Sequence, residues 1–502
     1  MIKYTKYFIF IFLGIIYSND GLNFSHSGYT NIYAINRISD QSLIKAPFKL
    51  LSYDLTLDYK EFSINTKFGL EHKLKTDKWY DISNSNVDYK FEFREYYLSY
   101  FPSFGEISLG KKIHAWGAVD GNSPLDILNP TNFYYLFTDL DETKMGRESI
   151  ILDLFASDNI KIQLLAMPGH GIDFIPQNDP NFPIQLPAYP GANNFLDQSD
   201  LNNPIEFGGY IQTSLSNMDW GIYYFSGYDR KFNLYGSNVW QNTEGSDLLQ
   251  IIDTVFSYRK TEMIGVSNVS FIGDITLRAD FAYFNTDDGN HIIDNRPYQG
   301  SDLLMDTAYY WEEFNMTLNY REINGFPDTP EYIQYFDFHG SYYQYCLQLE
   351  YGLPLDIDFT TQIFGYNSDQ IKFTDIDINI TSFNFSVKDL FFPGMGSSMG
   401  TLCNNGVLLN FTKRFFDDSM EFQMTNLLDT KDKGQLHQLK WTYDIMDNMS
   451  LSFLLYKGIG NRTTFPDITF IDVTGPDGNP DGINDDVIDN ETGGRAPNGD
   501  GI

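Results

Sequence analysis

The chain has 502 residues, enough for several soluble domains or for one large barrel. Its formal net charge of −33 argues against a nucleic-acid partner, because phosphate contacts need clustered lysine and arginine. Aromatic residues make up 17% of the chain, which favours a tall sheet with aromatic girdles over a cytosolic enzyme. A mean hydropathy of −0.31 excludes a bundle of transmembrane helices.

The first residues have the layout of a secretory signal. Lys3 and Lys6 precede an apolar core that ends at Ile16, and small or polar residues follow from Ser18. The apolar core is shorter than the roughly 20 residues that a membrane-spanning helix needs. We therefore expect a signal peptide at residues 1–18 and a chain that leaves the cytoplasm.

Many later segments alternate apolar and polar residues with a period of two, which is typical of strands with one apolar face. In "DITLRADFAYFN", residues 274–285, Leu277 and Phe281 fall on one face, and Arg278 and Asp280 fall on the other. An arginine that faced lipid would cost about 2–4 kcal/mol at the bilayer midplane. The pattern therefore predicts one face against lipid and a charged face in a wet lumen. Segments with the same alternation are 51–59, 61–71, 345–351, 420–425 and 438–444.

Candidate strands are joined alternately by tight turns and by connections that are mostly much longer. Outer-membrane barrels have this arrangement, with short periplasmic turns and long extracellular loops, and closure satisfies the backbone in lipid. The sequence predicts an all-β, transmembrane, antiparallel up-and-down barrel of about 16–18 strands within residues 19–461. The tight turns are expected at 60–61, 102–104, 157–159, 217–219, 272–274, 352–356, 416–419 and 446–449, and the longer connections near 117–145, 170–205, 237–252, 287–340 and 368–399.

Residues 94–133 include "GKKIHAWGAVDGNSPLDILNP" and resemble a porin-like family of Gram-negative outer-membrane β-barrels of largely unknown function. A second block that is similar to the family is "FFPGMGSSMGTL", residues 391–402, and the resemblance covers most of residues 22–461. Lys112 stands where the family pattern has glutamine. The resemblance implies an outer-membrane barrel similar to proteins thought to move small or hydrophobic compounds, and it implies no particular substrate. The positions that match the family pattern are Gly110, Lys111, Trp116, Gly117, Asp120, Asp126, Asn129 and Pro130.

The segment "HAWGAVDGNSPLDILNP" is the candidate pore constriction. Ser123 and Pro124 suit the start of one short helix, and Asn129-Pro130 would end it. A loop with a helix can fold into a barrel and narrow the pore. The alternative is a packed loop whose aspartates cap backbone N–H groups. The expected constriction residues are Lys112, His114, Trp116, Asp120 and Asp126, joined on the wall by Arg278, Asp280 and Glu350.

The inward side of the predicted strands carries charges of both signs, which favours mutual ion pairs along the wall over a specific ligand site. Lys111 and Lys413 break the alternation and indicate bulges or side chains that reach the membrane interface. The inward set is Asp54, Asp58, Lys67, Glu71, Asp153, Lys161, Gln163, Arg278, Asp280, Gln348, Glu350, Gln362, Glu421, Gln423, Lys440 and Asp444.

Near the end of the chain, "DGNPDGINDD" has the spacing of a short calcium-binding loop. The twelfth position is Ile488 rather than glutamate, so the segment is no complete EF-hand. A solvated acidic loop is the alternative reading. The candidate Ca²⁺ ligands are Asp477, Asn479, Asp481, Ile483 and Asp485.

Residues 462–502 are rich in Gly, Asp and Asn and form an acidic loop or tail. About 17 strands can be counted from Leu22 to the segment 450–458, whereas single-chain bacterial barrels have an even number. We expect that the closing strand is missing from this chain. The alternative is that residues 463–473 form the closing strand, although Pro466 interrupts them.

No catalytic motif is present in the sequence, and the seven histidines are scattered. Cys346 and Cys403 suggest two isolated thiols rather than a disulfide framework. The sequence therefore predicts an outer-membrane channel or transporter for small solutes, with lipid and the barrel-assembly machinery as partners and no enzymatic activity. The alternative is a non-conducting barrel that acts as a surface-exposed binding or structural protein.

Overall fold

In the computed structural model, the described parts of the chain run from Gly21 to Gly460 with gaps. They are residues 21–39, 41, 43–44, 46–72, 89–136, 138, 142–174, 193–195, 204–241, 250–288, 332–335, 338–372, 391, 393–401, 403, 405–431 and 433–460. The predicted signal peptide, the candidate calcium ligands and the acidic segment 462–502 lie outside the described residues.

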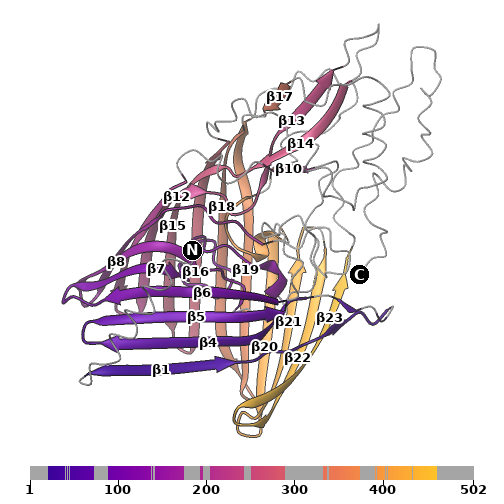
Figure 1. Ribbon diagram of the computed structural model, residues 1–502. Coiled ribbons are helices and arrows are strands. Elements are labelled where there is room, and N and C mark those ends of the chain that lie inside the picture. The colour runs from indigo at the N-terminus through magenta and orange to yellow at the C-terminus, as the bar shows by residue number, and fades with distance from the viewer. Residues whose placement is uncertain are drawn as a thin grey trace.

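A single 17-stranded antiparallel sheet curls into a barrel (Figure 1). Along the wall each strand pairs with the next barrel strand of the sequence, as in an up-and-down barrel. The strand number and the antiparallel order confirm the predicted fold class. The barrel strands are β1 (Leu22–Tyr29), β4 (Phe48–Tyr59), β5 (Phe62–His72), β6 (Tyr89–Tyr100), β7 (Gly105–Lys112), β8 (Arg147–Ser157), β9 (Ile160–Met167), β11 (Glu206–Leu215), β12 (Met218–Tyr228), β15 (Lys260–Ile272), β16 (Ile275–Asp287), β18 (His339–Leu353), β19 (Ile357–Lys372), β20 (Asn405–Phe415), β21 (Met420–Asp429), β22 (Gln435–Met446) and β23 (Met449–Ile459).

All the expected tight turns are present, and they lie together at one end of the barrel. The β4–β5 turn is Lys60 and Glu61, and the β15–β16 turn is Gly273 and Asp274. The mostly longer connections lie at the other end, which we call the loop end. The β21–β22 connection, residues 430–434, is the short exception there.

The two faces of the barrel wall differ in polarity, as β16 illustrates. Phe281 and Tyr283 are 44% and 39% exposed on the outside, whereas Asp280 and Phe284 are buried on the inside. Large apolar side chains are exposed in the same way on the outside of strands around the barrel, among them Phe91, Leu164, Ile222, Ile264, Leu347, Phe422 and Phe453. An exposed apolar band around the outside of a curled sheet is the surface that a membrane barrel presents to lipid.

The two lysines that break the alternation reach the ends of their strands rather than forming bulges. The Nζ of Lys111 donates to the Phe93 carbonyl at 2.7 Å near the loop end. The Nζ of Lys413 donates to the Leu355 carbonyl at the turn end. The strand registers through both lysines are unshifted, so the predicted bulge is absent at both positions, and interface snorkelling stays a prediction.

Within the described residues, three of the expected longer connections contain strands of their own. β12 pairs directly with β15, and between them lie β13 (Asn233–Gln241) and β14 (Gln250–Ser257). These two strands join β10 (Asn193–Phe195) and β17 (Tyr332–Tyr335) in a separate four-stranded sheet. Figure 1 shows this sheet beyond the loop ends of the barrel strands. Residues 237–252 were predicted to form a connection, and strands occupy both ends of this segment.

The remaining elements are short. β2 (Ile35–Asn36) and β3 (Leu43–Ile44) form a small hairpin between β1 and β4. The described residues include two 3-10 helices, η1 (Phe133–Tyr135) and η6 (Met399–Thr401). Within the described ranges, no helix has the length and apolar character needed to cross a membrane.

The first and last barrel strands have the same direction. In the part of the chain that the structure describes, β1 pairs with β4 and β23 pairs with β22. Seventeen strands in antiparallel order place β1 and β23 parallel to each other. One further strand antiparallel to both would pair with each of them, and the expectation of a closing strand stays a prediction.

Candidate functional site

Residues 113–146 join β7 to β8 and fold into the barrel, and we call them the inner loop. Trp116 binds the wall from inside the barrel: its indole Nε1 donates to Gln163 Oε1 on β9 at 2.9 Å. Its ring lies against those of Tyr210 and Tyr223, with centroid distances of 6.0 and 5.5 Å. The chain enters the lumen here rather than turning out to the surface.

Asp280 on β16 binds the next part of the inner loop. Its carboxylate accepts hydrogen bonds from the backbone N–H of Ala118 at 2.9 Å and of Val119 at 2.9 Å. Gly117 has a φ of +90°, and a Cβ built there would lie 2.6 Å from the Asp280 carboxylate. A glycine is therefore required for both the backbone conformation and the close approach.

Arg278 lies on the same inner face of β16, nearer the turn end. Its Nε donates to Glu350 Oε1 on β18 at 2.7 Å, and its Nη1 donates to the Ala118 carbonyl at 3.1 Å. The charged pair that stood out in the sequence thus holds the inner loop. Asp280 accepts hydrogen bonds from the N–H groups of Ala118 and Val119, and Arg278 donates a hydrogen bond to the Ala118 carbonyl.

Asp120 is the exposed tip of this part of the loop. Its backbone N–H donates to Gln348 Oε1 at 3.0 Å, and its carbonyl accepts from Gln362 Nε2 at 2.8 Å. Its carboxylate accepts from Gln348 Nε2 at 2.9 Å and lies 3.7 Å from Arg278 Nη1. The Asp120 side chain remains 69% exposed although the backbone around it is bonded to β18 and β19.

The expected short helix after Ser123 is absent. Ser123 Oγ accepts from the Leu125 N–H at 3.1 Å, but turns follow instead of a helix. Leu125, Ile127 and Leu128 are all buried in the core that fills this side of the lumen, together with Met395. In a helix, these three side chains would point in different directions and could not all pack against the wall. Burial of the apolar side chains therefore outweighs the helix-start signal of Ser123 and Pro124.

Two of the expected constriction residues are buried and do not line a passage. His114 is 5% exposed and Trp116 is 4% exposed. His114 shares two backbone hydrogen bonds with the Asn129 side chain, at 2.9 and 2.5 Å. Burial lowers the pKa of His114 to about 3, with help from Lys112 nearby, so its ring is neutral. These residues fix the path of the loop.

Asp126 and Lys112 also have partners. Asp126 forms an ion pair with Lys144 within the inner loop, and burial raises the pKa of its carboxyl. Lys112 Nζ lies 3.5 Å from Glu106 on the same strand and 4.7 Å from the centre of the Tyr97 ring. Of the five loop-side candidates, Asp120 is the one with a strongly exposed side chain.

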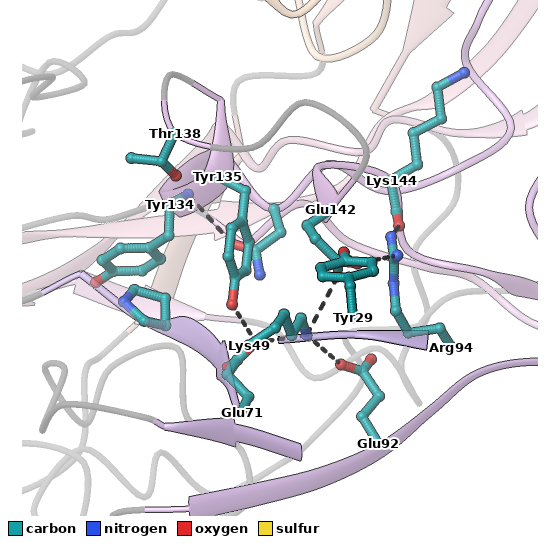
Figure 2. Close-up of polar contacts among 12 residues, drawn as sticks. Tyr29, Lys49, Glu71, Glu92, Arg94, Tyr134, Tyr135, Thr138, Glu142 and Lys144 are labelled. Carbon is teal, nitrogen blue, oxygen red and sulfur yellow. Dashed lines mark hydrogen bonds and ion pairs between the residues drawn. The ribbon is translucent and has the colours of Figure 1, made fainter. Parts of the chain in front are cut away.

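The returning part of the inner loop is fastened to the opposite wall by a buried cluster of charges, which we call the latch (Figure 2). Glu142 accepts from Arg94 Nη1 on β6 at 2.7 Å, and its Oε2 lies 3.4 Å from Lys49 Nζ on β4. Lys49 also donates to Glu71 on β5 at 2.8 Å. Figure 2 shows the Lys49 side chain pointing toward the carboxylates of Glu71, Glu142 and Glu92.

Two tyrosines complete the latch. The Tyr135 hydroxyl donates to Glu71 at 2.7 Å, and the Tyr29 hydroxyl, at the end of β1, donates to Glu142 at 2.5 Å. Sequence reasoning placed Glu71 on the inner face but missed Lys49, Arg94 and Glu142. Lys49 and Arg94 lie close to register shifts in their strands, and Glu142 lies in a loop, so strand alternation gave no clear signal for them.

The two blocks that resemble the family meet inside the barrel. The Met399 N–H donates to Asn122 Oδ1 of the inner loop at 3.2 Å. The Met395 carbonyl accepts from Tyr342 and Gln344 of β18, at 3.1 and 3.0 Å. Segments almost 280 residues apart in the sequence therefore pack together as one filling on this side of the lumen.

Below this filling, toward the turn end, the wall is polar and largely ion-paired. Lys161 lies 3.3 Å from Asp153, and Arg414 lies 3.0 Å from Asp358 and 3.2 Å from Glu421. Lys67 lies 3.8 Å from Asp54. The expected mutual pairing of inward charges is thus present along much of the wall. Among the residues that the structure describes, no group of three or more His, Cys, Asp or Glu side chains could hold a metal ion.

Comparison with protein-family models and with characterised proteins finds no match to this sequence. Similar solved structures include the outer membrane channel DcaP of Acinetobacter baumannii, with 9% identity, coverage of 88% of this chain and 99% of that one, and a TM-score of 0.38. OccK2 (OpdF) of Pseudomonas aeruginosa has 9% identity, 88% and 92% coverage and a TM-score of 0.42. The outer membrane protein OmpT of Vibrio cholerae has 9% identity, 88% and 96% coverage and a TM-score of 0.35.

The chain's own architecture remains the basis for its class. It combines antiparallel strands in up-and-down order, tight turns at one end, an apolar exterior and a long loop folded into a polar interior. These features make the chain an antiparallel up-and-down β-barrel with an apolar outer surface, the architecture of proteins that cross a membrane with strands.

Proposed function

We propose that the protein is a channel that passes small solutes across the outer membrane. The observation that carries the proposal is the inner loop, which is bonded to β9, β16, β18 and β19 and then to β4–β6. A loop fixed in this way narrows a barrel without being part of its wall. Asp120 at its tip stays exposed beside the charged Arg278 and Glu350.

The polar interior supports transport. The inward side chains are mostly paired carboxylates, lysines and arginines, which form a wettable wall. We infer small solutes as the cargo and assign no substrate. Outer-membrane lipid and the barrel-assembly machinery are the partners that follow from a barrel of this kind.

A second candidate function is display of the loop end by a barrel that does not conduct. It is favoured by the four-stranded sheet beyond the barrel, which is built from three different loops, and by the apolar filling below it. In that case the loops would bind a partner at the cell surface and the lumen would stay closed.

Single-channel recording in a planar lipid bilayer tests the proposal. The full chain, extracted from outer membranes without heating, should give discrete current steps in potassium chloride. The same preparation unfolded by heat serves as the control and should give none. A folded protein that inserts without any current steps would contradict the channel and favour surface display.

A further inference from the structure

Asp120 shares its cationic partner with a second carboxylate, unlike the carboxylates that face Lys112, Lys161 and Lys67. Lys112, Lys161 and Lys67 each have a carboxylate 3.3–3.8 Å from their Nζ. Arg278, in contrast, is shared between Glu350 at 2.7 Å and Asp120 at 3.7 Å. Asp120 is the more distant partner, so its charge is the less compensated of the two.

The position of Asp120 makes this charge face the solvent. Both backbone groups of Asp120 are bonded to wall glutamines, which hold the residue in place. The side chain is nevertheless 69% exposed, against 29% for Arg278 and 31% for Glu350. Gln348 links the carboxylates, because its Nε2 lies 2.9 Å from Asp120 Oδ2 and 2.7 Å from Glu350 Oε1.

Asp120, Arg278 and Glu350 together therefore carry one net negative charge where the inner loop lies against β16 and β18. Charged side chains at a constriction set the preference of a channel for cations or anions. We propose that Asp120 is the selectivity-determining residue of the channel and makes it prefer cations, with Arg278 and Glu350 as its positioning partners. This inference rests on the proposed channel function.

Reversal potentials across a potassium chloride gradient test the inference. The unmodified protein should be more permeable to K⁺ than to Cl⁻. Asp120→Asn should lower that permeability ratio by about two- to fivefold, because one charge near 4 Å from a passing ion changes its local concentration on that scale. The matched control is Glu262→Gln, which removes the same charge from the exposed outer face of β15.

The outcomes separate clearly. A lower ratio in Asp120→Asn with normal ion selectivity in Glu262→Gln supports the role of Asp120. An unchanged ratio in Asp120→Asn at normal conductance overturns it. Equal changes in both variants also overturn it, because the effect would then come from the charge of the whole molecule.

A second measurement does not depend on current, so it can fail independently of the channel proposal. Thr276→Cys places a thiol on the inner face opposite Glu350 in the β16–β18 register. Positively charged methanethiosulfonate reagents should label it faster than negatively charged ones, and adding Asp120→Asn should reduce this difference. Cys346 and Cys403 are buried and provide the background. Equal reduction by Glu262→Gln, or no reduction by Asp120→Asn, contradicts the inference even if the barrel does not conduct.

Discussion

Arg278 and Asp280 stand two residues apart on the inner face of β16 and bind the inner loop with opposite chemistry. Asp280 is 2% exposed and is satisfied by loop N–H groups, whereas Arg278 is shared among a carbonyl and two carboxylates. A buried carboxylate without such donors would be costly. The position of the inner loop therefore depends on β16, and the burial of Asp280 on β16 depends on the inner loop.

The neighbouring residues of β16 allow a direct test of which face meets lipid. Leu277→Arg should block assembly, because it places a charge on the lipid face at a cost of about 2–4 kcal/mol near the midplane. Thr276→Arg should be tolerated, because Thr276 faces inward and is paired in register with Glu350. The folded yield of each variant, read from gel mobility without heating, gives the answer. Equal yields would show that the two faces have been assigned wrongly.

The latch makes Glu142 the residue on which the return of the inner loop depends. Its side chain is fully buried and binds Arg94 and Lys49. Glu142→Ala should weaken loop docking, because breaking a buried ion pair costs about 3–5 kcal/mol. We expect faster protease cleavage of the inner loop in the folded barrel and noisier currents.

The control for this variant is Glu92→Gln. The Glu92 carboxylate is 20% exposed and lies 3.9 Å from Lys49, so its loss should have a smaller effect. Equal cleavage rates for Glu142→Ala and the unmodified protein would mean that the latch does not hold the loop.

Among the elements, β13 and β14 should be dispensable for the barrel. β12 and β15 pair with each other along their length without these strands. Leu234 and Phe256 are partners in register, so a two-glycine turn can join them and replace residues 235–255. The shortened protein should still show the gel mobility of a folded barrel. Deletion of β15 alone is the control and should prevent folding. If the protein without residues 235–255 also failed to fold, the four-stranded sheet would be required for barrel assembly.

The elements that could be predicted from the sequence are those with a local signal. The alternation in β16 and the tight turns on either side of the strands need only neighbouring residues, and both were correct. The missing helix after Ser123 shows the limit, since burial of Leu125 and Leu128 against the wall outweighs a local start signal. The latch could not be predicted, because Lys49, Arg94 and Glu142 come from separate segments that only the closed wall brings together.

At the scale of the whole molecule, the exposed apolar exterior predicts an envelope protein with heat-modifiable mobility. The protein should be recovered with the outer-membrane fraction and should run differently on a gel before and after heating. A closed hydrogen-bonded sheet resists detergent until it is heated, which is the physical reason for the shift. Recovery as a soluble periplasmic protein, with one mobility under both conditions, would end the barrel interpretation.

The attachment of the inner loop also fixes the order of events during folding. Asp120 follows β7, yet its carbonyl is bound by Gln362, which is 242 residues later in the sequence. Contacts between residues so far apart form only after the chain between them has been brought together. The binding surface for Asp120 therefore does not exist until β18 and β19 have joined the wall. Docking of the Asp120 segment is therefore a late step in the assembly of the barrel.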